Sequence, residues 1–195
     1  MTTRLLAVLA AVGALALSGC SADDAGSSPA GTGATEPAGT TAAPETEPLP
    51  AVEPAAGSTT MTAPGLTLSV PPSWETGDES EEGLTQLTAR AELEDGTRAA
   101  VNLVGVPDDE TDVESAVAEV RGLGELRDER LVTLPRLSTT GPATLLDLDY
   151  AVEGQTARTW VLVFAHQGVT WTVTFLSDPF DETLARETLG TLRDA

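Results

Sequence analysis

The chain has 195 residues and is strongly acidic, with 31 Asp and Glu against ten Lys and Arg and a formal net charge of −21. All ten cations are arginines, since the chain contains no lysine. Nucleic-acid binding is disfavoured, because a phosphate backbone is engaged by clustered Lys and Arg. The single cysteine excludes an internal disulfide. With one histidine and no lysine, most routes to covalent catalysis and transition-metal binding are also closed.

The N-terminal residues have the pattern of an export signal. Met1–Arg4 form a short positive region, and Leu5–Leu17 follow as an unbroken run of apolar and small residues. As a helix this run would rise about 20 Å, too little for a hydrocarbon core of about 30 Å. The pattern therefore predicts a signal peptide rather than a transmembrane helix.

The run ends in Leu17-Ser18-Gly19-Cys20, which resembles the lipobox of bacterial lipoproteins. The resemblance implies a diacylglyceryl group on the Cys20 thiol and cleavage between Gly19 and Cys20. Two long acyl chains anchor a protein stably where one would not. We predict a signal peptide at residues 1–19 and a lipid-anchored protein on the extracytoplasmic face of the cell membrane. The alternative is an ordinary secretory signal with a chance cysteine.

Residues 20–63 are expected to comprise the lipidated Cys20 and a disordered linker. This stretch is dominated by Ala, Gly, Pro, Thr, Ser and Glu and contains no aromatic residue. Such a segment cannot bury enough apolar surface to offset its chain entropy. As a flexible coil it would span about 35 Å. Its Ser and Thr residues would also permit O-glycosylation.

Residues 64–195 are predicted to form one folded domain, because short alternating apolar runs begin at Pro64. The expected strands are Leu66–Val70, Leu84–Leu93, Ala99–Val106, Leu131–Leu137, Ala143–Val152, Trp160–His166 and Val169–Ser177.

Two helices interrupt these strands. The first is expected over Val113–Leu123, with Thr111 and Glu114 at capping-box spacing and Gly124 as its stop. The second is expected over Pro179–Arg193, with Asp178 as N-cap and Pro179 at the first helical position.

The last two strands give the most specific structural prediction. With Gln167-Gly168 as a two-residue turn, Phe164 faces Trp171, Leu162 faces Val173 and Trp160 faces Phe175. Both faces of this hairpin are apolar, so it should be central and covered on both sides. We predict an α+β domain in which an antiparallel sheet is flanked by two helices, or by one helix and a loop.

Two segments resemble the PsbP-like fold, and in particular the LpqN-type lipoproteins of actinobacteria. The first, Gly65 to Trp74, looks like the opening strand and Pro-x-x-Trp corner of that fold. The second, Ser177-Asp178-Pro179-Phe180, looks like its short loop into a final helix. The resemblance implies a fold and an envelope lipoprotein, and it contributes no catalytic residue.

Few residues suggest chemistry. His166 is expected to be a partly exposed imidazole at a sheet end, since no motif identifies the Ser and Asp partners of a catalytic triad. Asp147 and Asp149 alternate on one strand and are expected to be solvated. They are nevertheless the residues on which a carboxylate-dependent hydrolase would depend. Trp74 either closes the edge of the core or lines a groove for an apolar or sugar ligand.

Two acidic clusters, Asp78–Glu82 and Asp108–Asp112, are candidate calcium ligands. In the second, Asp108, Glu110, Asp112 and Glu119 imitate EF-hand spacing, but Val113 replaces the required glycine. Acids beside a helix N-terminus are already explained by the helix dipole. We therefore predict no metal site and no cofactor.

The sequence as a whole favours a tethered, non-catalytic module that binds an envelope protein or an apolar envelope molecule. Two alternatives remain open. One is a carboxylate-dependent cell-wall hydrolase, and the other is a structural or chaperone role for exported proteins.

Overall fold

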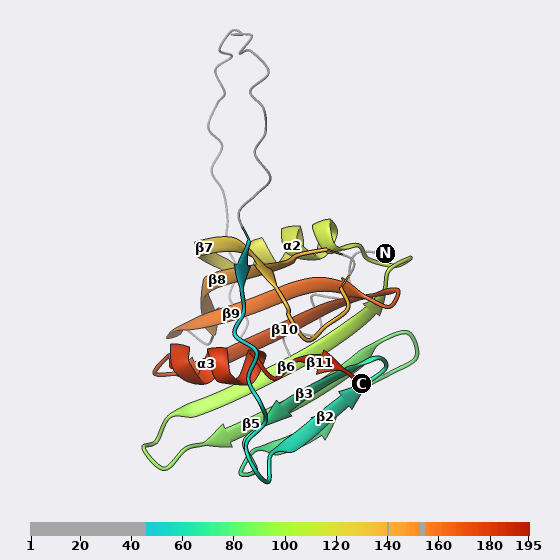
Figure 1. The fold of residues 1–195 in the computed structure, drawn as a ribbon. Coiled ribbons are helices and arrows are strands. Elements are labelled where there is room, and N and C mark those ends of the chain that lie inside the picture. The colour runs from blue at the N-terminus through green and yellow to red at the C-terminus, as the bar shows by residue number, and fades with distance from the viewer. Residues whose placement is uncertain (1–45, 140, 153–154) are drawn as a thin grey trace, which may run out of the picture.

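The computed structural model describes residues 46–139, 141–152 and 155–195 (Figure 1). The strands are β1 (Glu47–Pro48), β2 (Thr59–Ala63), β3 (Leu66–Val70), β4 (Glu75–Asp78), β5 (Thr85–Glu92), β6 (Arg98–Pro107), β7 (Gly124–Thr133), β8 (Ala143–Val152), β9 (Gln155–His166), β10 (Val169–Asp178) and β11 (Arg193–Asp194). The helices are α2 (Val113–Arg121) and α3 (Glu182–Leu189).

The strands form two sheets. The large sheet has the order β1-β7-β8-β9-β10-β6-β5-β4, and the small one has the order β11-β3-β2. All pairings are antiparallel except that of β1 with β7. The mixed α+β class was predicted correctly, whereas the small second sheet was not predicted.

The β9–β10 hairpin has the predicted register and lies at the centre of the large sheet. Trp171 pairs with Phe164, Val173 with Leu162, and Phe175 with Trp160. Gln167 and Gly168 both adopt positive φ in the intervening turn, as the right-handed twist of the flanking strands requires. Alternation and turn chemistry therefore determined this register.

Both faces of the hairpin are covered. On one face its aromatic side chains are buried with the small sheet and with Ala185 and Leu189 of α3. On the other face α2 contributes Ala116, Val117 and Val120 to a separate apolar cluster with Leu146, Leu148, Val161 and Val163. Figure 1 shows α3 and the small sheet on the side of the large sheet that faces the viewer.

α2 begins at Val113 as predicted, but the N-caps of both helices and the start of α3 differ from the prediction. The N-cap of α2 is Asp112, whose Oδ1 accepts a hydrogen bond from the Ser115 amide at 2.7 Å, rather than Thr111. The N-cap of α3 is Asp181, because Asp178 still belongs to β10. α3 ends at Leu189, and the segment expected to complete it contains β11 instead.

The strand predicted over Leu131–Leu137 was mostly wrong. β7 begins at Gly124, which was expected only to stop the helix, and it ends at Thr133. Most of β7 is an exposed, charged edge, so it lacks the apolar alternation by which strands are recognised.

The predicted linker boundary at residue 63 was also wrong. Residues 46–58, which we call the N-terminal segment, lead from β1 down the front of the large sheet to β2 (Figure 1). Leu49 is only 4% exposed, and its amide donates to the Thr133 carbonyl at 3.0 Å. The Val52 amide donates to the Gly190 carbonyl at 2.9 Å. The N-terminal segment and β2 are therefore part of the folded domain.

Candidate functional site

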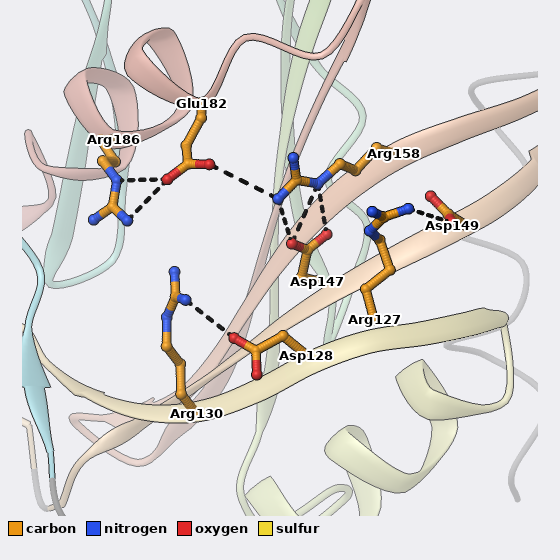
Figure 2. Close-up of polar contacts among 8 residues, drawn as sticks. All are labelled: Arg127, Asp128, Arg130, Asp147, Asp149, Arg158, Glu182 and Arg186. Carbon is orange, nitrogen blue, oxygen red and sulfur yellow. Dashed lines mark hydrogen bonds and ion pairs between the residues drawn. The ribbon is translucent and has the colours of Figure 1, made fainter.

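Charged side chains gather on the part of the large sheet next to α3 (Figure 2). We call them the arginine–carboxylate cluster, and they are Arg127, Asp128 and Arg130 of β7, Asp147 and Asp149 of β8, Arg158 of β9, and Glu182 and Arg186 of α3. The cluster holds four of the ten arginines of the chain and four carboxylates. These eight side chains balance one another in charge, in a chain whose net charge is −21, and Glu47 of β1 adds one carboxylate beside them, with its Oε2 3.9 Å from Arg130 Nε.

Asp147 and Arg158 form the most buried pair of the cluster. Arg158 Nη2 lies 2.6 Å from Asp147 Oδ2, and Arg158 Nε lies 3.0 Å from Asp147 Oδ1, so the contact is bidentate. The side chain of Asp147 is only 11% exposed. Burial, the largest single influence, raises the pKa of Asp147, but the hydrogen bonds and charge of Arg158 outweigh it and the pKa is lowered. Asp147 is therefore held as a carboxylate.

Aromatic rings lie beneath these arginines. The guanidinium carbons of Arg130 and Arg186 lie 5.4 Å and 5.2 Å from the ring centroid of Trp160, and that of Arg158 lies 4.5 Å from the ring of Phe180. The two rings are 5.7 Å apart. Cation–π contacts of this kind orient guanidinium groups as well as stabilising them. The charged side chains thus lie on a pair of contacting aromatic rings.

The indole N–H of Trp160 is a buried donor at this site. It lowers the pKa of the Asp147 carboxyl group, although Nε1 makes no hydrogen bond of ordinary geometry with any described residue. Asp147 is thus approached by two donors from β9, Arg158 and Trp160, which lie on the same face of that strand.

Replacing Arg158 with glutamine should destabilise the fold by about 1–3 kcal/mol, because the Asp147 carboxylate would remain buried without its bidentate partner. Arg127→Gln is the matched control. Arg127 binds Asp149 at 2.7 Å on a more exposed surface, so its loss should cost less than about 1 kcal/mol. Urea unfolding at neutral pH measures both values. Equal effects of the two substitutions would contradict this ranking.

The same pair predicts a pH dependence. Because folding lowers the pKa of Asp147, its stabilisation is complete above the ordinary pKa of an aspartate and is lost as the pH falls through the lower, folded-state pKa. The Arg158→Gln variant should therefore lose less stability than the unmodified chain on acidification. Unfolding curves from pH 7 down to pH 3 test this, and parallel curves would argue against it.

Asp147 and Asp149 do share one face of β8, but they are not a free carboxylate pair. Asp147 is buried rather than solvated as expected, and Arg158 holds it. Asp149 is bound by Arg127. A general acid needs a raised pKa, which is the opposite of what Arg158 gives Asp147.

His166 is buried, which corrects the expectation of a partly exposed imidazole. Its Nε2 lies 2.9 Å from the Gly65 carbonyl and 3.4 Å from Asp194 Oδ1, and its Nδ1 lies 3.3 Å from the Ser138 carbonyl. A serine, Ser138, and an aspartate, Asp194, therefore do lie next to the imidazole of His166. However, the Ser138 hydroxyl donates to Asp194 at 2.8 Å and not to the imidazole, so this is not the arrangement of a catalytic triad.

The acidic clusters serve local structure. Asp108 accepts a hydrogen bond from the Thr170 hydroxyl at 3.0 Å, and Asp112 caps α2. Asp78 accepts from the Ser80 amide, and Glu79 accepts from the Gln86 side chain, each at 3.0 Å. Within residues 46–139, 141–152 and 155–195, no group of three or more ligating side chains is placed to hold a metal ion.

Trp74 lies in the main core and is 4% exposed, which agrees with a residue that closes the core edge. Gly19 and Cys20 lie outside the described residues, so cleavage and lipidation there stay predictions. In the part of the chain that the structure describes, no helix is long and apolar enough to cross a membrane.

The fold is a mixed α+β domain made mostly of sheet. No protein-family model and no curated protein matches the chain. Among solved structures, the chain is similar to that of LpqN, described as involved in cell envelope biogenesis of Mycobacterium tuberculosis, with 18% sequence identity and a TM-score of 0.41. The match covers 71% of this chain and 90% of LpqN. Nothing about function follows from a likeness this distant.

Proposed function

We propose that the chain is a lipoprotein anchored to the extracytoplasmic face of the cell membrane, and that its domain is a non-catalytic interaction module for an envelope protein. The proposed location rests on the lipobox-like sequence Leu17–Cys20. We also propose that the domain has the PsbP-like arrangement of LpqN-type lipoproteins, on the strength of the Gly65–Trp74 and Ser177–Phe180 motifs.

The arginine–carboxylate cluster is the observation that carries the binding role. Arginine side chains that stack on aromatic rings are typical of surfaces that recognise proteins. The planar guanidinium group makes directional hydrogen bonds, and it also packs against aromatic side chains. Here the cluster concentrates arginine on one face of an otherwise acidic chain. A partner with alternating acidic and basic groups would match its balanced charge.

A protein partner fits this surface better than an apolar molecule. Among the described residues, Leu126 is the only large hydrophobic side chain that is exposed. The aromatic face of the hairpin is fully covered. A binding site for an apolar molecule would require a concave apolar surface, for which neither face of the hairpin is available.

Photocrosslinking in living cells tests the proposal. A photoreactive residue at exposed Thr183, next to Glu182 of the cluster, should capture a specific envelope protein. The same residue at Glu75 on β4, at the far edge of the large sheet, is the matched control. Adding Arg186→Gln should abolish the product formed from position 183.

The product at position 183 should have a mass different from twice that of the chain, because the partner is a different protein. An identical product from position 75, or a product that survives Arg186→Gln, would count against the cluster as the binding surface. Loss of a wall-hydrolase activity in Asp147→Asn or Asp149→Asn chains that remain folded would favour the catalytic alternative instead.

A further inference from the structure

Within the described part of the chain, the outer edge of β7 is largely unpaired. β1 pairs with β7 only at Val132 and Thr133, and residues 124–131 have no other ladder partner on that edge among the described residues. Residues 125–129 are all exposed. Leu126, with 42% of its surface exposed, is one of them. This edge can therefore accept another strand.

The charges along this edge are complementary to themselves. The sequence from Glu125 is Glu-Leu-Arg-Asp-Glu-Arg. If a second copy of β7 runs antiparallel about the centre of the unpaired stretch, Glu125 faces Arg130 of the other copy and Arg127 faces Asp128. Each of these pairs occurs twice by symmetry, so every one of the four charges faces an opposite charge. These contacts would add to the ion pairs within one copy, in which Arg127 binds Asp149 and Arg130 lies near Asp128 and Glu47.

The faces of the strand agree with this pairing. Glu125 and Asp128 lie opposite Asp149 and Asp147 of β8, and Arg130 lies opposite Leu145, so all three point to the α3 side. Arg127 points to the same side, because it binds Asp149. A two-fold axis perpendicular to the sheet keeps that side in common, so the opposite charges meet.

The β7 side chains on the α2 side of the sheet are also compatible with this antiparallel pairing. Leu126 lies opposite Leu148, and Glu129 lies opposite Leu146, so both point to the α2 side. Arg121 of α2 binds Glu129 with its Nε at 2.7 Å from Oε2, which neutralises that carboxylate. In the antiparallel pair, Leu126 of each copy packs on this neutralised pair of the other.

We propose that two copies of this chain associate through the β7 edges, antiparallel and centred between Arg127 and Asp128, so that the large sheet continues from one copy into the other. Charges and a bulge at a sheet edge usually prevent pairing with unrelated strands, and β7 has both, with its register shift between Leu126 and Asp128. The order of the charges nevertheless admits a copy of the same strand. A contact of this length is small, so the association is reversible.

Reciprocal charge reversal tests the pairing on the full chain in a non-ionic detergent. Glu125→Arg and Arg130→Glu, each alone, place like charges opposite one another at two symmetry-related positions. Each should weaken dimerisation about tenfold or more. An equimolar mixture of the two variants restores opposite charges throughout, so mixed dimers should form with nearly the original affinity. Sedimentation equilibrium measures all of these constants.

Glu75→Arg makes the same change of charge on the other edge of the large sheet and should leave dimerisation unchanged. Circular dichroism verifies that each variant is folded. A chain that stays monomeric at all concentrations would overturn the proposal. So would a mixture that associates no better than its components, or an effect of Glu75→Arg equal to that of Glu125→Arg.

Discussion

Replacing Cys20 with serine is expected to release the protein from the membrane fraction. Serine has no thiol, so the thioether to a diacylglyceryl group cannot form. Each buried acyl methylene contributes about 0.8 kcal/mol to membrane binding, so two long chains hold a protein firmly and their loss leaves no comparable anchor. Cell fractionation with intact-mass measurement of the mature chain would show both the change of location and the missing lipid.

Ser18→Ala provides the matched control, because it keeps a small residue next to the cleavage position. That variant should be processed and anchored like the unmodified chain. Retention of the Cys20→Ser chain in the membrane at the original level would show that the lipid is not the anchor. If Cys20 of the mature chain proves unmodified, or if the signal peptide is still attached, the proposed lipid anchor and membrane location are also contradicted.

The central hairpin was predictable because local signals determine its register. The turn at Gln167-Gly168 fixes which residues face one another, and strict alternation places Trp160, Leu162 and Phe164 on one side. A shift of one residue would have moved every aromatic side chain to the other face. The sequence therefore allowed only one arrangement that buries them together.

Edge elements were harder to predict, because tertiary contacts create them. β7 is charged and mostly exposed, and β1 is two residues long. The N-terminal segment and β2 have the composition of a linker, yet Leu49 of the segment and Met61 of β2 are buried against the domain. The amino-acid composition of a stretch of chain indicates only whether that stretch could form a core by itself. Here a few apolar residues of the N-terminal segment and β2 are buried against the core of the rest of the domain, which their composition does not reveal.

The arginine–carboxylate cluster was missed for a related reason. Asp147 was singled out, but its partner Arg158 lies on the next strand and meets it only through the β8–β9 pairing, whose register was not predicted. One signal was present in the sequence. Arg158 stands two residues before Trp160, on the face that carries the aromatic side chains, where a charged residue needs a partner.

Gly190 is the residue at which the N-terminal segment depends on the absence of a side chain. Its φ of −67° is helical, so alanine is compatible with the backbone conformation. Space is the constraint. A Cβ atom there would lie 2.7 Å from Val52 Cγ2 and 2.8 Å from the Arg186 carbonyl oxygen, and it would overlap the Pro50 carbonyl oxygen. Two of these three contacts are with backbone atoms, which cannot rotate away.

Gly190→Ala should therefore push the N-terminal segment off α3, with a cost of about 1–3 kcal/mol for overpacking and a fall in Tm of at least about 4 °C. Residues 46–58 should also become sensitive to a non-specific protease, because the Val52–Gly190 hydrogen bond is lost with the contact. Gly141→Ala is the control, since its Cβ would meet no atom within 4 Å. If both variants melt together and resist cleavage equally, the N-terminal segment does not contribute to the stability of the fold, and a linker that extends to residue 63 becomes the better description.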